Sequence, residues 1–213
     1  MTSLATRLLE ACEKHRERTA LVCEGRSLTY GELLARPVAP AAPYRLLHGP
    51  KNLEAGAALF DCLRSGTAFV PLDDSWPAAR VARARAVLDR PGALRPEDAL
   101  VLFTSGSTGE PKGIPLSAGN IDYFLDWSTR LLDFTEDDAI PNLAPLGFDL
   151  SILDILGAWR AGARVELFPA EAAYAPEDLC ERLAGEFTFL YAAPSLLMHL
   201  QNKGGLAGKL ANG

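Results

Sequence analysis

One ten-residue stretch, TSGSTGEPKG at positions 104–113, limits what this chain can fold into more than any other part of it. It contains three glycines, four hydroxyl side chains and one lysine, and it directly follows the apolar run 99–103, which is typical of a buried strand. Glycines let the backbone approach an anion closely, amide and hydroxyl groups donate hydrogen bonds to it, and a lysine adds positive charge. The stretch therefore predicts a loop after a strand that binds the phosphates of a nucleotide.

This stretch is not the Walker A sequence of P-loop proteins. Counted from Gly106, the spacing of that motif reaches Lys112, but Pro111 stands where the motif has glycine, and Gly113 stands where it has serine or threonine. The alternative is an ordinary surface loop. We favour phosphate binding, because one short loop rarely combines these residue types in this order by chance.

The stretch closely resembles the phosphate loop of the adenylate-forming enzymes. That family includes acyl-CoA synthetases, luciferase-like enzymes and the adenylation domains of nonribosomal peptide synthetases. Three further segments resemble the family in the same order: LTYGEL at 28–33, LRSGTAFVPLD at 63–73 and FDLS at 148–151. The resemblance extends from about residue 17 to about residue 200, and it covers the first half of the family's motifs. It implies the N-terminal part of the adenylate-forming fold.

The resemblance also implies roles for the loop residues. The nucleotide would be ATP, and Lys112 would be the catalytic residue. The chemistry would be attack by a substrate carboxylate on the α-phosphorus with release of pyrophosphate, which depends on positioning and charge neutralisation more than on a protein nucleophile. The residues expected to hold the β- and γ-phosphates are Thr104, Ser105, Gly106, Ser107, Thr108, Gly109 and Lys112.

Asp149 is the residue that bears most on the substrate. Apolar residues flank it, so we expect a buried carboxylate, which costs free energy unless it is paired; the alternative is a helix cap. In peptide-synthetase adenylation domains the matching aspartate binds the α-amino group of an amino acid, and acyl-CoA synthetases generally lack it. By the same resemblance, Leu150, Leu153 and Tyr191 would line the side-chain pocket, although each is also a plausible core residue.

Strand-like and helix-like segments alternate along the chain. This pattern predicts an α/β fold, a layered α/β sandwich with a largely parallel sheet. Among the elements, we expect a hairpin at 20–28, a helix at 149–161 and a strand at 187–191. The glycine-rich end, 202–213, is expected to be frayed.

The expected domain organisation follows from the resemblance. Residues 1–213 would form a truncated N-terminal adenylation (AMP-binding) domain, divided into subdomains 1–98 and 99–213. The chain departs from the family pattern between Leu88 and Ala99, where only ten residues stand in place of another strand-helix-strand stretch.

Composition excludes several other classes of protein. The net charge is −6, and acidic and basic residues are interspersed. The sequence therefore contains no basic patch that would indicate nucleic-acid binding. The four cysteines are widely scattered, without a C-x-x-C pair, and the three histidines follow no metal spacing, so we expect no protein-bound structural metal. No apolar run approaches membrane-spanning length, and no signal peptide is recognisable, so we expect no membrane association and a cytoplasmic location.

Three functions remain open at this stage. The first is ATP- and Mg²⁺-dependent activation of an amino acid as its adenylate, for transfer to the phosphopantetheine thiol of a carrier protein. Its partners would be the amino acid, the carrier protein and the missing C-terminal half of the domain, because the family's later motifs do not occur after Ser195. The second is an acyl- or aryl-CoA ligase fragment. The third is a non-catalytic nucleotide-binding module that kept the fold and lost the reaction.

Overall fold

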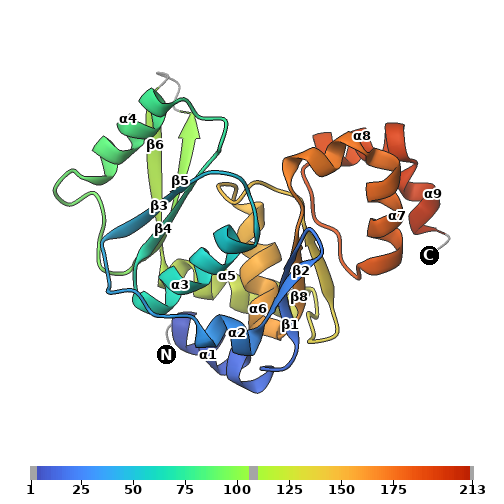
Figure 1. Cartoon of the computed structure of the whole chain (residues 1–213), viewed down its shortest axis with the longest axis horizontal. Coiled ribbons are helices and arrows are strands. Elements are labelled where there is room, and N and C mark those ends of the chain that lie inside the picture. Colours follow the sequence, from blue (N-terminus) through green and yellow to red (C-terminus); the bar gives the residue numbers. More distant parts are fainter. Residues whose placement is uncertain (1–3, 106–109, 212–213) are drawn as a thin grey trace.

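The structure, a computed structural model, describes residues 4–105 and 110–211. These residues form two four-stranded sheets with helices between them and on their outer faces (Figure 1). Parallel pairing prevails in both sheets, and each contains one antiparallel pair. This confirms the predicted α/β class and its layered, largely parallel architecture. No helix in the described part of the chain is long and apolar enough to cross a membrane.

The first sheet has the strand order β2-β1-β8-β7 and combines two segments that are far apart in the sequence. The predicted hairpin is confirmed: β1 and β2 pair across Glu24 and Gly25, whose φ angles of 49° and 74° suit a tight hairpin turn. β8 pairs in parallel with both β1 and β7. The strands are β1 (Thr19–Cys23), β2 (Arg26–Thr29), β7 (Ala139–Asn142) and β8 (Arg164–Leu167).

The second sheet has the order β3-β4-β5-β6, and its first three strands are parallel. β6 returns antiparallel to β5 at the sheet edge, with Thr104 opposite Lys112. The sequence did not suggest β6, because Pro111 and Pro115 disfavour strands; an edge position tolerates them, since fewer backbone N–H groups are needed there. Strands from both sides of residue 98 occur in each sheet. The second sheet contains β3 (Tyr44–His48), β4 (Ala68–Leu72), β5 (Asp98–Ser105) and β6 (Pro111–Ser117).

Helix α3 (Leu53–Ser65) packs between the two sheets and contributes to the largest apolar core. Gly56 permits its close approach to the first sheet, because a Cβ atom there would lie 2.8 Å from Leu21 and 2.9 Å from Leu167. The Asn52 side chain caps the helix by accepting a hydrogen bond from Ala55 N–H. α3 thus fixes the spacing between the sheets.

The helix predicted at 149–161 is present but differs in type. A π-helical segment, η1 (Ile152–Gly157), continues directly into α6 (Ala158–Ala161). The buried Trp159 anchors it: its indole N–H donates to Ala20 O at 3.1 Å in β1, and its ring meets Phe60 of α3 edge to face. Apolar spacing does not distinguish π from α turns, and π segments are often found at functional sites.

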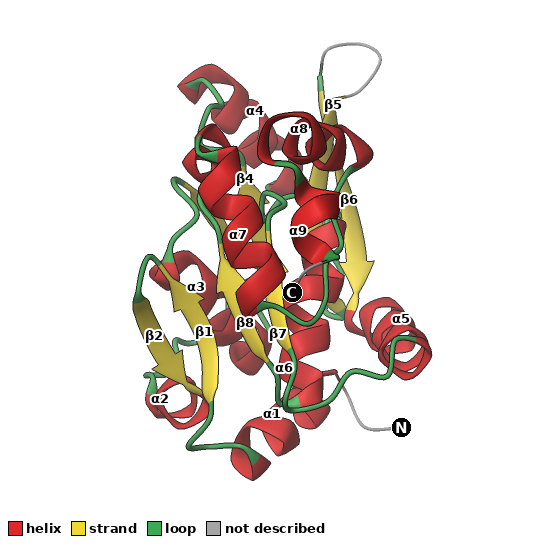
Figure 2. Cartoon of the chain, turned by 90° about the vertical axis from the view of Figure 1, so that its right-hand side faces the viewer, coloured by secondary structure: helices red, strands yellow, loops and turns green. Residues whose placement is uncertain are grey.

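The remaining helices cover the outside. α4 packs on the second sheet through Ala84 and Leu88, opposite the face that α3 covers. Near the end of β8, α7, α8 and α9 form a separate cluster in front of the first sheet (Figure 2). These elements are α1 (Leu4–Lys14), α2 (Tyr30–Ala35), α4 (Ala78–Leu88), α5 (Ala118–Leu131), η2 (Ala170–Tyr174), α7 (Pro176–Glu186), α8 (Pro194–Gly204) and α9 (Leu206–Leu210).

Two predictions near the C-terminus are wrong. The segment 187–191 is not a strand. Thr188 N–H donates to Ala139 O, as in a β-sheet, but Ala139 N–H donates to the side-chain hydroxyl of Thr188. Because that bond does not go to a backbone carbonyl, the regular backbone pairing of a β-strand does not form. The end is not frayed over its described residues either. α9 packs there through the buried Leu206, and Lys209 pairs with Glu181 at 2.9 Å.

Candidate functional site

A cavity of about 840 Å³ lies where strands of both sheets end. Its lining includes residues that directly follow β3, β4, β7 and β8, together with the last residues of β5. Ligands of open α/β sheets bind outside the carboxyl ends of the strands, so the topology itself marks this cavity as a binding site. Residues that represent the five strand ends are Lys51, Asp73, Thr104, Phe148 and Glu171.

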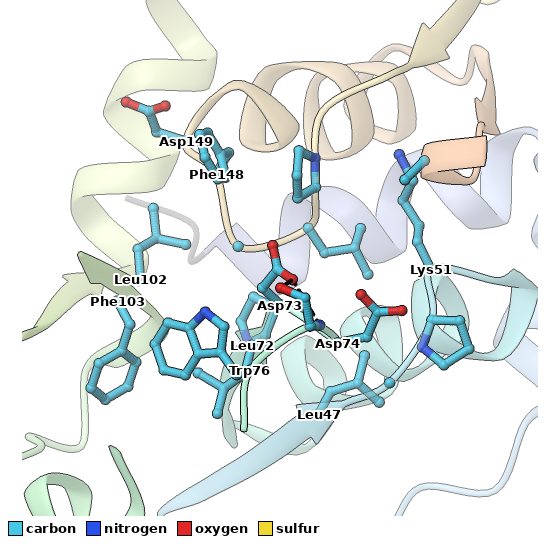
Figure 3. A pocket seen from close by; sticks show the side chains of 18 of the residues that line it. Leu47, Lys51, Leu72, Asp73, Asp74, Trp76, Leu102, Phe103, Phe148 and Asp149 are labelled. Carbon is cyan, nitrogen blue, oxygen red and sulfur yellow. Dashed lines mark hydrogen bonds between the residues drawn. The ribbon is translucent and has the colours of Figure 1, made fainter. Parts of the chain in front are cut away.

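The wall next to β4 is aromatic and charged. The Trp76 ring lies under the Arg80 guanidinium, whose carbon is 3.8 Å from the ring centroid, and it meets Phe103 edge to face at 6.1 Å. The Asp73 carboxylate accepts hydrogen bonds from the Ser75 N–H and hydroxyl at 2.9 and 2.5 Å. Figure 3 shows Asp73, Asp74 and Trp76 close together beside Leu72. This wall therefore offers both a ring face and acidic oxygens.

The hairpin of β5 and β6 carries the predicted phosphate loop. Thr104 is exposed and lines the cavity, while Lys112 is exposed on β6. Directly opposite residues of an antiparallel pair share a face, so Lys112 projects on the same side as Thr104. Ile114 and Leu116, also on that face by the two-residue alternation, line the cavity as well. Lys112 therefore lies on the same face of the hairpin as these lining residues, although it does not itself line the cavity.

Part of the predicted loop cannot be placed. Ser105 pairs with Pro111 at the hairpin end, and its side chain is not described. The other four predicted phosphate-binding residues, Gly106, Ser107, Thr108 and Gly109, lie outside the described residues.

Asp149 lines the cavity but is not buried. Its side chain is exposed and makes no hydrogen bond or ion pair with any described residue, so the predicted burial is wrong, and no capping bond is present. Its neighbour Phe148 is 54% exposed, because the turn between Pro145 and Asp149 lies at the surface rather than in the core. In Figure 3 the Asp149 carboxylate points away from the labelled residues of the opposite wall.

The other predicted substrate residues are not brought together around this cavity. Leu150 is half-buried, Leu153 is 6% exposed within η1, and Tyr191 is 43% exposed. None of the three lines the cavity in the described structure. Of the predicted site residues whose side chains the structure describes, Asp149 and Thr104 line the cavity.

A buried polar cluster beside the cavity was missed by sequence reasoning. The Lys51 ammonium donates to Asn142 O at 3.0 Å, to Asn142 Oδ1 at 3.3 Å and to Ala144 O at 2.9 Å. The Asn142 amide nitrogen donates to Ser151 Oγ at 3.1 Å and to Asp154 Oδ2 at 3.0 Å. Asn142 and Asp154 are both 0% exposed. No local signal marks these residues in the sequence, because they come from three separate segments.

Burial dominates the protonation chemistry of this cluster. It raises the pKa of the Asp154 carboxyl to about 7, although the Asn142 hydrogen bond and the Lys51 charge lower it. It lowers the pKa of the Lys51 ammonium to about 8, against the attraction of Asp154. Asp154 Oδ1 is buried without a hydrogen-bond partner in the described structure. In this cluster, burial thus disfavours the charged forms of both the Lys51 ammonium and the Asp154 carboxyl.

Curated proteins similar to this chain are carrier-protein ligases and peptide synthetases. A protein of Pseudomonas fluorescens named L-proline--[L-prolyl-carrier protein] ligase is 30% identical over an alignment of 264 residues that takes in 97% of this chain and 53% of that protein. The D-alanine--D-alanyl carrier protein ligase of Bacillus licheniformis is 25% identical over 83% of this chain and 45% of its own length. The chain therefore spans about half the length of each of these two curated relatives.

Solved structures agree with the fold. The nonribosomal peptide synthetase FmoA3 (S1046A) in its alpha-methyl-L-serine-AMP bound form superposes with a TM-score of 0.77 at 25% identity, covering 95% of this chain and 28% of that chain. A family model described as AMP-binding enzyme matches residues 83–212, more than half of the chain. The chain thus belongs to the AMP-binding enzyme family.

Proposed function

We propose that this chain forms the ATP- and amino-acid-binding part of an adenylate-forming ligase. The observation that carries the proposal is the convergence of five strand ends on one cavity, with Thr104 of the phosphate-loop hairpin and Asp149 both in its lining. Those two residues come from separate segments, and both line this cavity, which supports the proposal. Membership of the AMP-binding family and the names of the relatives support the same reaction class.

The proposed step joins an amino acid carboxylate to AMP. A carboxylate oxygen attacks the α-phosphorus of ATP, a new C–O–P linkage forms, and the bond to the β-phosphate oxygen breaks so that pyrophosphate leaves with the electron pair. Residues 104–109 would donate hydrogen bonds to the β- and γ-phosphates, and Lys112 would neutralise the charge that develops on them. Lys112 is suited to this because no described residue holds its ammonium group.

Magnesium enters the proposal only as a companion of ATP. The described residues contain no group of three or more histidine, cysteine or acidic side chains that could hold a metal ion. Mg²⁺ typically keeps several waters and binds through substrate phosphates with one or two carboxylates, so a protein cage is not required. Since the described residues provide no defined metal site, no catalytic step is assigned to the ion.

The substrate assignment rests on Asp149 and on the relatives. Asp149 would pair with the ammonium group of the amino acid at the cavity mouth, and binding would then bury a carboxylate that is exposed in this structure. Leu150, Leu153 and Tyr191 remain proposed contacts of the amino acid side chain. Transfer to a carrier-protein thiol is proposed because two relatives are named for carrier-protein ligation.

A chimera tests the proposal. This chain would replace the matching part of the Pseudomonas fluorescens ligase, and ATP–pyrophosphate exchange would be measured with a panel of amino acids and their deaminated analogues. We expect exchange with amino acids and none with deaminated acids. Equal exchange with both would favour the acyl- or aryl-acid ligase, and nucleotide binding without any exchange would favour the non-catalytic module.

A further inference from the structure

The segment 143–149, here called the cavity segment, connects β7 to η1 and forms one wall of the cavity. It belongs to neither sheet, and within it Phe148 N–H donates to Pro145 O at 3.0 Å. The Pro145 carbonyl can accept a second hydrogen bond, and the Ala144 carbonyl receives none from within the segment. Side chains from two other segments donate to these carbonyl groups.

Lys51 supplies the first set. It follows β3, on the opposite sheet, and its ammonium group has three N–H donors. All three are used, on Asn142 O, Asn142 Oδ1 and Ala144 O. Lys51 lines the cavity but has no proton left for a ligand, so its role differs from that of a phosphate-binding lysine.

Ser151 and Asp154 complete the attachment from the other side. Ser151 Oγ donates to Pro145 O at 2.8 Å and accepts from the Asn142 amide. Asp154, fully buried in η1, accepts from the same amide and provides the negative charge nearest to Lys51 within the cluster. Asn142 therefore receives hydrogen bonds from Lys51 and donates them to Ser151 and Asp154, which joins both sheets at the base of the cavity segment.

We propose that Lys51 is a positioning residue that fixes the cavity segment from the opposite sheet and so places Phe148 and Asp149 at the cavity mouth. The attachment itself follows from the geometry of the hydrogen bonds. Its consequence for recognition of the amino acid rests on the proposed function. Lys51 acts through Ala144 and Asn142, and it does not touch substrate.

Hydrogen exchange on the 213-residue chain tests the attachment. Lys51→Met removes the three donors and keeps an unbranched side chain that is one atom shorter. Lys203→Met, at an exposed site on α8, is the matched control. We expect amide exchange in 143–149 to accelerate about tenfold or more, with β4 and β8 unchanged, as for a local opening. Unchanged exchange in the cavity segment, or equal acceleration throughout the chain, would overturn the proposal.

A second, milder variant tests the same attachment in case Lys51→Met unfolds the chain. Ser151→Ala removes only the hydroxyl that holds Pro145 O, and it should accelerate exchange in the same segment by about threefold. If Lys51→Met does not fold, this variant decides the question. Faster exchange confined to 143–149 would support the attachment, and unchanged exchange in that segment would overturn it.

The chimera separates positioning from stability. There, Lys51→Met should raise KM for the amino acid about tenfold while KM for ATP stays within about twofold, because the phosphate-loop hairpin is on another wall. An equal rise in both would show a merely structural role. If the unmodified chimera is inactive, the proposed function fails, and the hydrogen-exchange result still decides the attachment.

Discussion

Two walls of the cavity are built in opposite ways. The cavity segment is held by the side chains of Lys51 and Ser151, which donate to Ala144 O and Pro145 O. Both side chains are hydrogen-bonded to the buried side chain of Asn142. The hairpin wall presents Thr104 and Lys112 as exposed side chains without partners among the described residues. The Lys51 ammonium donates three hydrogen bonds, whereas the Lys112 ammonium donates none to a described residue. The first wall is thus fixed by the protein itself, and the second leaves its polar groups free for a ligand.

The largest effect is expected at the centre of the fixed wall. Asn142→Ala removes the side-chain groups that join Lys51, Ser151 and Asp154, and it leaves Lys51 and the buried Asp154 with fewer hydrogen-bond partners. We expect a loss of about 4 kcal/mol in the free energy of unfolding, measured by urea denaturation. Asn202→Ala, at an exposed position on α8, should change it by less than about 0.5 kcal/mol. Similar losses in both variants would mean that the hydrogen bonds of this cluster add no more to the free energy of unfolding than an exposed side chain does.

The same substitution at each of the two lysines tests the comparison next. Lys51→Met should lower the free energy of unfolding by about 3 kcal/mol. This is somewhat less than for Asn142→Ala, because Asp154, without the nearby positive charge, can take up a proton. Lys112→Met should cost less than about 0.5 kcal/mol and weaken binding of an ATP analogue, measured by calorimetry. The comparison would be broken by a strongly destabilised Lys112 variant or by unchanged nucleotide affinity in it.

The buried carboxyl predicts a pH effect. Folding raises the pKa of Asp154 from 3.8 to about 7, so the folded state favours the protonated carboxyl. The stability that results is fully present below pH 4 and is lost as the pH rises through 7. Relative to Asp154→Asn, the unmodified chain should therefore lose about 2 kcal/mol of stability between pH 5 and pH 7. Urea denaturation at several pH values measures the difference, and parallel pH profiles for the two proteins would refute it.

The smallest effect is expected at the cavity mouth. Asp149 is exposed and unpaired, so Asp149→Asn should leave the free energy of unfolding nearly unchanged. In the chimera it should raise KM for the amino acid about tenfold, equivalent to about 1.4 kcal/mol, and leave KM for ATP unaffected. Unaltered recognition of the amino acid would remove Asp149 from the site.

Local features of the sequence account for several elements. Thr29 and Glu32 form a capping box at the start of α2, and Gly66 ends α3 with a φ of 68°. Such features depend on neighbours within a few residues, so a single sequence contains them. β6 and the failed strand at 187–191 depend instead on tertiary context, namely an edge position and a side-chain hydroxyl that replaces a backbone acceptor.

The candidate site divides in the same manner. The phosphate-loop stretch and Asp149 are continuous motifs, and the sequence suggested both. The cluster of Lys51, Asn142 and Asp154 assembles from a strand-helix connection, a strand end and a π-helical segment, so no short-range pattern could reveal it. Apolar neighbours also misled at Asp149, because a turn exposes residues that a helix would have buried.

Mapping an ATP analogue on the 213-residue chain tests the central claim that one cavity at the strand ends is the binding site. Backbone amide shifts would be recorded by NMR as AMPPNP is added. We predict shifts at strand ends of both sheets, at Asp73 and Thr104 on one side and at Ala144 and Glu171 on the other. Shifts confined to the shallow hollow between His48 and Arg85, or no shifts at either set of strand ends, would contradict the account.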